Sequence, residues 1–540
     1  MAVEVGGPSG ERVESILSLV REKLPADQAP QVEEFVRQYY AELEPADLTA
    51  HSVLDAYGAA LAHWHLVRHR APREAKVRVY TPQLEEHGWQ SAHTVVEVVT
   101  DDMPFLVDSV TMEVNRHEHG IHLIVHPVIW VRRDEGGKLL EVVAPDAPRD
   151  GAIAESLIHV EVDRQTEHEA LEELQNHVQR VLGDVYAAAE DWTAMRERMR
   201  AIVADLGANP PPLDPEEVAE SKALLEWIED HHFTFLGYRE YELRTDGGED
   251  VLRAVPGTGL GILRETAAKP TSVTKLSPEA RRLARAATLL TLTKANSRAT
   301  VHRPAYLDYV GVKLFDSAGE VRGEQRFLGL YTSTAYRARP GKIPVLRRKV
   351  ERLLDRSGFP PGGYSHKALL EILETYPRDE LFQISEDELF EIAMAIFHLG
   401  ERKRTRLLVR RDAWGRFFSC LVFVPREKYT TETRLRMQET LLEALGGESA
   451  DFDVRFWESP LARVHFIIRT KRGHLPEYDV REIERRLVAV TRSWADDLYD
   501  ALIDECGEGR GTGLFRKYEE AFPAAYRADF LARMAVPDIE

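Results

Sequence analysis

The sequence predicts an α+β protein built from several domains. Three observations lead to this prediction: the length of 540 residues, the interleaving of helical with strand-like segments, and a proline-rich break at residues 208–217. A single hydrophobic core rarely grows beyond about 250–300 residues, so three or four domains are expected. The four prolines in the break exclude a helix or a central strand and mark a linker.

Two helical regions and two strand-rich modules are predicted before the third module. The first 72 residues repeat apolar side chains at helical spacing, and the alternation typical of strands begins at Lys76. Strands are predicted over residues 76–80, 93–100, 121–134 (one long strand) and 156–165, with helices over 104–120 and 166–188. After the linker come a helix over 221–231, strands over 233–244, 257–264, 288–295, 305–316 and 324–333, and a helical zone over 342–399.

The third module resembles the first in its order of elements. Strands are predicted over residues 405–412, 416–427, 451–458 and 463–470, with helices over 431–445, 480–505 and 518–534. Because both modules combine a few strands with one or two helices, we expect two related small domains flanking a different one.

Composition narrows the class of protein. The net charge of −20 disfavours nucleic acid or an anionic membrane as a partner, because the mean field repels phosphate. Only Cys420 and Cys506 occur, so no disulfide framework is expected. Because no signal peptide and no apolar stretch of about 18–20 residues is found, the sequence predicts a soluble, cytoplasmic protein.

No catalytic, cofactor-binding or metal site is predicted. Gly257, Gly259 and Gly261 are followed by Ile262 where a dinucleotide-binding loop needs its third glycine, so a turn is expected. Four histidines in NRHEHGIHLIVHP suggest either a zinc site or a polar sheet face, and the second reading is favoured. Two of them, His122 and His126, would lie about 13 Å apart along one strand, too far for one metal. The four are His117, His119, His122 and His126.

The segment TDDMPFL joins a strand to a helix and is the candidate effector loop. Backbone N–H groups at the start of a helix can hold an anion such as an α-carboxylate, and the two aspartates could meet its ammonium group. The alternative is an ordinary capped helix start, in which Leu106, Val110 and Val114 dock on the sheet. The loop residues are Asp101, Asp102, Met103, Pro104, Phe105 and Leu106.

A basic stretch, ERKRTRLLVRRDAWGR, is the candidate interface. Its arginines could pair with the excess carboxylates of this chain or of a partner subunit, and the aromatic residues after it enter an apolar strand. Single-stranded nucleic acid is the weaker alternative. The candidate interface residues are Arg402, Arg404, Arg406 and Arg410.

Long strings along the chain resemble one family. TDDMPFLVDSVTMEVNRHEHGIHLIVHPV, HHFTFLGYREYEL, RFFSCLVFVPREKYTTETR and TRSWADDLYDAL are similar to the N-terminal region of the large bacterial NAD-specific glutamate dehydrogenases. The resemblance covers nearly all 540 residues. It implies two ferredoxin-like ACT domains and a PAS-like antiparallel-sheet module joined by helical segments. The implied divisions are a helical segment (1–72), the first ACT-like domain (76–190), a helix and linker (191–217), the PAS-like domain (218–340), a helical connector (341–400), the second ACT-like domain (403–472) and a C-terminal helical segment (476–540).

The resemblance also implies a role. This chain would be the regulatory and oligomerisation part of an enzyme that oxidises L-glutamate with NAD⁺, without the catalytic domain, so NAD is implied only for the whole enzyme. The implied partners are further copies of the chain, an amino-acid effector and the catalytic region. The alternative is a stand-alone sensor of amino acids or other small molecules, with His231, His232 and Tyr238 as candidates in the PAS-like module.

One position departs from the family of amino-acid-binding ACT domains. Their loop after the first strand usually has a glycine soon after the proline, and here Phe105 follows Pro104. A phenylalanine would fill that space, so the domain could instead serve packing between subunits.

Overall fold

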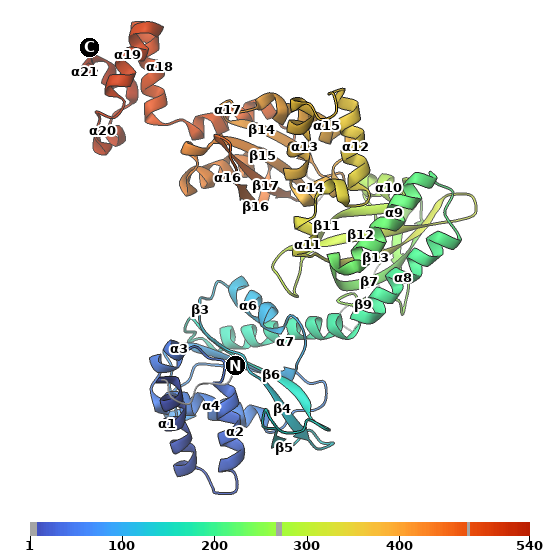
Figure 1. Cartoon of the computed structure of the whole chain (residues 1–540), viewed down its shortest axis with the longest axis vertical. Coiled ribbons are helices and arrows are strands. Elements are labelled where there is room, and N and C mark those ends of the chain that lie inside the picture. Colours follow the sequence, from blue (N-terminus) through green and yellow to red (C-terminus); the bar gives the residue numbers. More distant parts are fainter. Residues whose placement is uncertain (1–7, 266–272, 472–475, 540) are drawn as a thin grey trace. The chain divides into compact units, whose positions relative to one another are not determined.

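A computed structural model of the protein describes residues 8–265, 273–471 and 476–539. It contains helices and antiparallel sheets in mixed order, which confirms the predicted multi-domain α+β class (Figure 1). The described chain divides into two compact units. Unit 1 runs to Thr274 and includes Thr288–Ala335; unit 2 holds Lys275–Ala287 and the chain from Tyr336 onward. Across these ranges, we find no helix with the length and apolar character needed to cross a membrane.

The first sheet of unit 1 is antiparallel, with the strand order β1-β2-β6-β4-β5 and with β3 also paired to β6. Valines dominate β2, whose residues are buried along nearly its whole length. The strands are β1 (Lys76–Tyr80), β2 (Thr94–Asp101), β3 (Ile121–Val125), β4 (Val128–Arg133), β5 (Leu139–Val142) and β6 (Ile153–Val162).

Helices cover both faces of this sheet (Figure 1). Val98 of β2 packs with α6 and α7, whereas the next residue, Val99, packs with the N-terminal helices, as the two-residue period of a strand requires. Leu106, Val110 and Val114 are buried, which confirms the predicted docking stripe. The helices are α1 (Pro8–Lys23), α2 (Ala29–Tyr39), α3 (Pro45–Ala50), α4 (Val53–Val67), α5 (Leu84–His87), α6 (Leu106–Arg116) and α7 (His168–Glu190).

Three predicted elements are interrupted. One is the helix expected over 518–534, which the structure divides into the end of α19 (Glu508–Tyr518), α20 (Ala524–Asp529) and η4 (Ala532–Ala535). The single strand expected over residues 121–134 is wrong: Pro127, which has no N–H to donate, separates β3 from β4, and the two pair with different halves of β6. The single helix expected over 480–505 is also wrong. Ser493 ends it by capping a new helix, since its hydroxyl accepts from the Asp496 N–H and the Asp496 carboxylate accepts from the Ser493 N–H.

The second sheet of unit 1 has the order β10-β8-β7-β13-β12-β11, with β9 also paired to β7. Gly257 lies in a turn at φ of +76°. Gly261, the second residue of β9, has a φ of +59°, and a Cβ there would lie 2.1 Å from the Leu236 carbonyl oxygen. The strand expected over 257–264 is therefore reduced to the two residues of β9. The elements are α8 (Trp192–Ala208), α9 (Pro215–Trp227), η1 (Ile228–His232), β7 (Phe233–Asp246), β8 (Glu249–Ala254), β9 (Leu260–Gly261), β10 (Val273–Lys275), β11 (Leu290–Arg298), β12 (Tyr306–Phe315) and β13 (Val321–Tyr331).

Unit 2 contains a four-stranded antiparallel sheet of order β14-β15-β17-β16. Its apolar face packs against α16 and α17. The strands are β14 (Arg406–Arg411), β15 (Phe417–Pro425), β16 (Gly447–Arg455) and β17 (Leu461–Thr470). The helices are α10 (Pro278–Arg285), α12 (Leu346–Ser357), α13 (Tyr364–Thr375), α14 (Arg378–Gln383), α15 (Glu386–Leu399), α16 (Thr431–Leu445), α17 (Val480–Thr491), α18 (Trp494–Cys506), α19 (Glu508–Tyr518), α20 (Ala524–Asp529) and α21 (Val536–Ile539). Four short elements complete the chain, namely α11 (Ser333–Arg337), η2 (Pro340–Lys342), η3 (Arg426–Lys428) and η4 (Ala532–Ala535).

Candidate functional site

The candidate effector loop begins at the last residue of β2 and ends at the first residue of α6. Asp102 and Pro104 are exposed, and the Asp102 N–H donates to the Ala154 carbonyl at 3.0 Å. Met103 packs against the core of unit 1, and Leu106 is buried. The loop is therefore anchored to β6 and to the core on its inner side.

The carboxylate of Asp101 is not free for a ligand, because Arg70 already binds it. Arg70 Nη2 donates to Asp101 Oδ1 at 2.5 Å, and Arg70 Nε and Nη2 donate to Glu155 Oε1 at 2.9 and 2.7 Å. Arg133 donates to both oxygens of Glu155, at 2.7 and 2.6 Å. Glu155 is fully buried, and Arg70 is 1% exposed. A ligand ammonium group would have to share Asp101 with this network.

Phe105 shapes the other end of the loop. Its φ of +73° is left-handed, a conformation that favours glycine and costs a bulky residue energy. The ring packs against the core and lies 4.8 Å from the His302 ring, centroid to centroid. The His302 N–H donates to Ser109 Oγ at 3.0 Å. The segment around His302 therefore covers the first turn of α6, where the anion was expected to bind.

The four candidate interface arginines do not share one surface. Arg402 and Arg404 are exposed, while Arg406 donates to Glu484 at 3.0 Å. Arg410 points into unit 2, where its Nε and Nη2 donate to the two oxygens of Glu380 at 2.7 and 2.9 Å. Arg410 is 2% exposed, so a partner subunit cannot contact its guanidinium group there.

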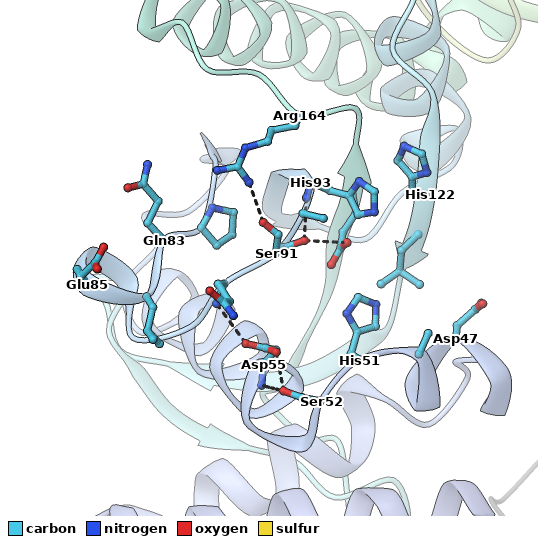
Figure 2. A pocket seen from close by; sticks show the side chains of 17 residues that line it. Asp47, His51, Ser52, Asp55, Gln83, Glu85, Ser91, His93, His122 and Arg164 are labelled. Carbon is cyan, nitrogen blue, oxygen red and sulfur yellow. Dashed lines mark hydrogen bonds between the residues drawn. The ribbon is translucent and has the colours of Figure 1, made fainter.

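A broad polar pocket of about 920 Å³ lies beside the first sheet. Figure 2 shows its labelled side chains coming from α3, from the start of α4, from the segment around α5, from β3 and from the residues that follow β6. The rings of His93 and His122 stack at 4.0 Å, and Arg164 Nη1 donates to the Ser91 carbonyl at 3.0 Å. Glu161 accepts from the Ser91 hydroxyl at 3.2 Å. The pocket combines groups of both charge signs, which suits a small zwitterion.

A buried charge cluster lies on the face of the first sheet that the N-terminal helices cover. It contains His63 of α4, Glu97 of β2 and His159 of β6, none more than 1% exposed. His159 Nδ1 lies 3.8 Å from Glu97 Oε1, and its Nε2 lies 3.6 Å from Glu161 Oε1. Arg78 Nε donates to Glu97 Oε2 at 2.9 Å. Two carboxylates thus face one arginine and one histidine.

The charge states follow from these contacts. His63 Nε2 donates to the Val98 carbonyl and its Nδ1 accepts from the Tyr39 hydroxyl, both at 3.1 Å; burial lowers the pKa of His63 to about 4. Burial also opposes the charges on His159 and Glu97, but their attraction outweighs it. The pKa of His159 rises to about 9 and that of Glu97 falls to about 2.

The stability of unit 1 is therefore expected to fall between pH 6.5 and 9. Folded His159 keeps its proton up to pH about 9, whereas an unfolded histidine loses it near 6.5. Its contribution is complete below pH 6.5 and is lost as the pH rises through 9, by up to roughly 3 kcal/mol. His63 acts oppositely, since its depressed pKa costs stability as the pH falls from 6.5 towards 4. Urea unfolding at stepped pH values measures both slopes.

The His159→Gln variant tests the assignment, because it should flatten the alkaline slope. The exposed His168 of α7 provides the control: His168→Gln should leave the slope unchanged. A steep alkaline slope that persists in His159→Gln would contradict the assignment.

Several of these residues lie outside the sequence prediction. Arg70, Glu155 and the His63 cluster were missed, although Glu97 amid the valines of β2 was a signal, because a buried charge needs a partner. The three candidate sensor residues of the predicted PAS-like module do not form one site. Tyr238 is fully buried and donates to Glu240 at 2.7 Å, His232 stacks on Trp227 at 4.1 Å, and His231 is exposed.

Comparison with known domains gives four matches in chain order. Residues 35–178 match the ACT1 domain of glutamate dehydrogenase, and residues 406–495 match its ACT2 domain. Residues 343–402 and 501–540 match its helical motifs 1 and 2. The chain therefore carries domains of the glutamate dehydrogenase family. The ACT1 match contains the effector loop, the polar pocket and the His63 cluster, and the ACT2 match contains the Arg410 strand.

Three relatives, each called NAD-specific glutamate dehydrogenase, match along the chain. The protein of Halomonas elongata is 41% identical over 524 residues, or 96% of this chain and 32% of the relative. That of Pseudomonas aeruginosa is 38% identical over 513 residues, 95% of this chain and 32% of the relative. That of Mycobacterium tuberculosis is 30% identical over 495 residues, 88% of this chain and 29% of the relative. The chain thus spans about a third of the length of these glutamate dehydrogenases.

Proposed function

We propose that this chain is the regulatory and assembly segment of an NAD-dependent glutamate dehydrogenase. The parent reaction would convert L-glutamate, NAD⁺ and water to 2-oxoglutarate, ammonium, NADH and a proton. The observation that carries the proposal is the series of matched modules, which are two ACT domains and two helical motifs. In this proposal NAD and the reacting glutamate bind to the catalytic region, while this chain makes subunit contacts.

The arrangement of each ACT sheet supports a scaffolding role. In unit 1, helices cover both faces of the sheet and the buried Arg70–Glu155 network joins β6 to the segment before β1. In unit 2, Arg410 of β14 holds Glu380 of α14 in a paired, buried contact. Such internally braced sheets leave strand edges and exposed charged side chains, among them Arg402 and Arg404, for contacts between subunits.

The purified chain should form oligomers and should not reduce NAD⁺ with L-glutamate. Light scattering measures the mass, and NADH absorbance measures turnover. Replacing the exposed Arg402 and Arg404 with glutamate should shift the mass towards one copy. The new negative charges would repel the carboxylates of the partner subunit that the arginines are expected to bind. The matched control is Arg322→Glu, on an exposed position of β13. Turnover by the chain alone would contradict the proposal, as would a single-copy mass for the unaltered chain.

A second candidate function is the sensing of a small zwitterion, favoured by the mixed charges of the polar pocket. Arg164 and the paired rings of His93 and His122 could meet a carboxylate, while Glu161 and Asp55 could meet an ammonium group. Calorimetry with L-glutamate and L-aspartate tests this role. Arg164→Gln should weaken the measured affinity at least about tenfold, as expected for the loss of a charge-assisted hydrogen bond. An affinity unchanged by that variant would mean that the ligand binds elsewhere, and no heat with either amino acid would leave assembly as the role.

A further inference from the structure

The four histidines of segment 117–126 contact different parts of the domain. His122 donates to Asp163 at 2.8 Å, His126 contacts Ser156 Oγ at 2.6 Å, and His119 lies 3.3 Å from Gln165 Nε2. His117, just after the end of α6, instead meets His177 of α7. The two residues are 60 positions apart in the chain, so local patterns do not connect them.

His117 and His177 form a compact group with Glu113. His117 Nε2 and His177 Nδ1 lie 2.7 Å apart, and Glu113 Oε1 lies 3.5 Å from the first and 3.9 Å from the second. The histidines are 23% and 27% exposed, and Glu113 is 2% exposed. The group is thus open on one side and backed by a buried carboxylate.

The spacing suits a zinc ion. Zinc binds imidazole nitrogen and carboxylate oxygen at about 2.0–2.2 Å in a tetrahedron, which places neighbouring ligand atoms roughly 3.3–3.5 Å apart. The three distances in this group bracket that range, so small side-chain rotations would complete the geometry.

The two helices repeat one motif here. Residues 113–117 read Glu-x-x-x-His on α6 and its C-terminal cap, and residues 173–177 read Glu-x-x-x-His on α7. A spacing of four residues places both side chains on one helix face. Glu173 is exposed and lies one helical turn before His177. A water would fill the fourth position of a tetrahedral ion.

We propose that Glu113, His117 and His177 bind one Zn²⁺ ion that ties α6 to α7 in the ACT1 domain. The ion would replace the direct contact between the two rings, in which a single proton must be shared. Arg116 and Arg180 now also reach Glu113, but both are about half exposed and can turn to solvent when the ion binds. This site has three protein ligands, as in zinc sites that keep an open position.

The second close group of this kind in the described chain, His63, Glu97 and His159, is a poorer ligand set. Both ring nitrogens of His63 already have partners, and Glu97 is held by Arg78. A metal there would have to break buried hydrogen bonds. The comparison favours the α6–α7 site.

Titration of the full chain with ZnCl2, after removal of metals with a chelator, tests the proposal. We expect one Zn²⁺ per chain by calorimetry and an upward shift of the thermal unfolding temperature, with no such shift from MgCl2, because Mg²⁺ prefers oxygen ligands. His117→Gln and His177→Gln should each weaken binding at least about tenfold. His168→Gln is the matched control, since His168 lies at the start of the same helix beside Glu172, and it should bind Zn²⁺ as the unaltered chain does.

Two outcomes would overturn the site. One is an unaltered chain that takes up no Zn²⁺ and shows no thermal shift. The other is equal Zn²⁺ affinity in His177→Gln and in the unaltered chain while the metal-free variant unfolds at the same temperature. Because the readouts are binding and unfolding, neither depends on whether the proposed assembly role is correct.

Discussion

The Glu155→Ala variant is expected to lose about 3–5 kcal/mol of unfolding free energy, the cost of breaking a buried ion pair. Glu155 accepts four hydrogen bonds from Arg70 and Arg133, and both guanidinium groups lie inside unit 1. Removing the carboxylate leaves Arg70 only Asp101 as an anionic partner and leaves Arg133 without its close carboxylate partner. Urea unfolding measures the loss, and hydrogen exchange of β2 and β6 locates it.

The control for this variant lies in the same sheet. Glu141 of β5 pairs with Arg132, but the two side chains are 45% and 30% exposed. Glu141→Ala should therefore cost no more than about 1 kcal/mol. Equal costs for the two variants would show that the buried network contributes nothing special to unit 1.

The second large effect is expected in unit 2, where Glu380→Ala should cost about 3–5 kcal/mol. Glu380 and Arg410 are almost fully buried and share two hydrogen bonds. Burial opposes the negative charge, yet Arg410 outweighs it and lowers the pKa of Glu380. The variant leaves a buried guanidinium group, so α14 should separate from the sheet more often.

Hydrogen exchange of residues 378–383 detects that separation, and urea unfolding gives its free energy. Glu427→Ala is the matched control, because its partner Lys403 is 63% exposed and the pair contributes about 1 kcal/mol at most. Protection of α14 that is unchanged in Glu380→Ala would contradict the assigned role of the pair.

Local patterns predicted much of the fold. The valines of β2 and the stripe of α6 are buried as their periods indicate. The errors in the predicted strands and helices have local causes that the spacing of apolar residues does not reveal. Pro127 interrupts the hydrophobic run between β3 and β4, and Ser493 caps a helix within a run that is otherwise helical.

The candidate site was less predictable, since its contacts join distant parts of the chain. The carboxylate of Asp101 is a suitable group to bind an ammonium ion, but its partner Arg70 comes from the segment before the first strand. Arg410 belongs to a basic run that indicates an exposed surface, but its guanidinium group is buried in an ion pair with Glu380. Charge patterns indicate that such side chains need partners, whereas only the tertiary fold selects them.

Phe105 has a consequence for how this ACT domain could have changed over time. Because its ring is tethered to this loop, a free metabolite would have to compete with the high effective concentration of the ring. The backbone already has the left-handed shape that glycine adopts without strain. Replacing Phe105 with glycine would keep the path of the chain and would open a space at the loop for a small molecule.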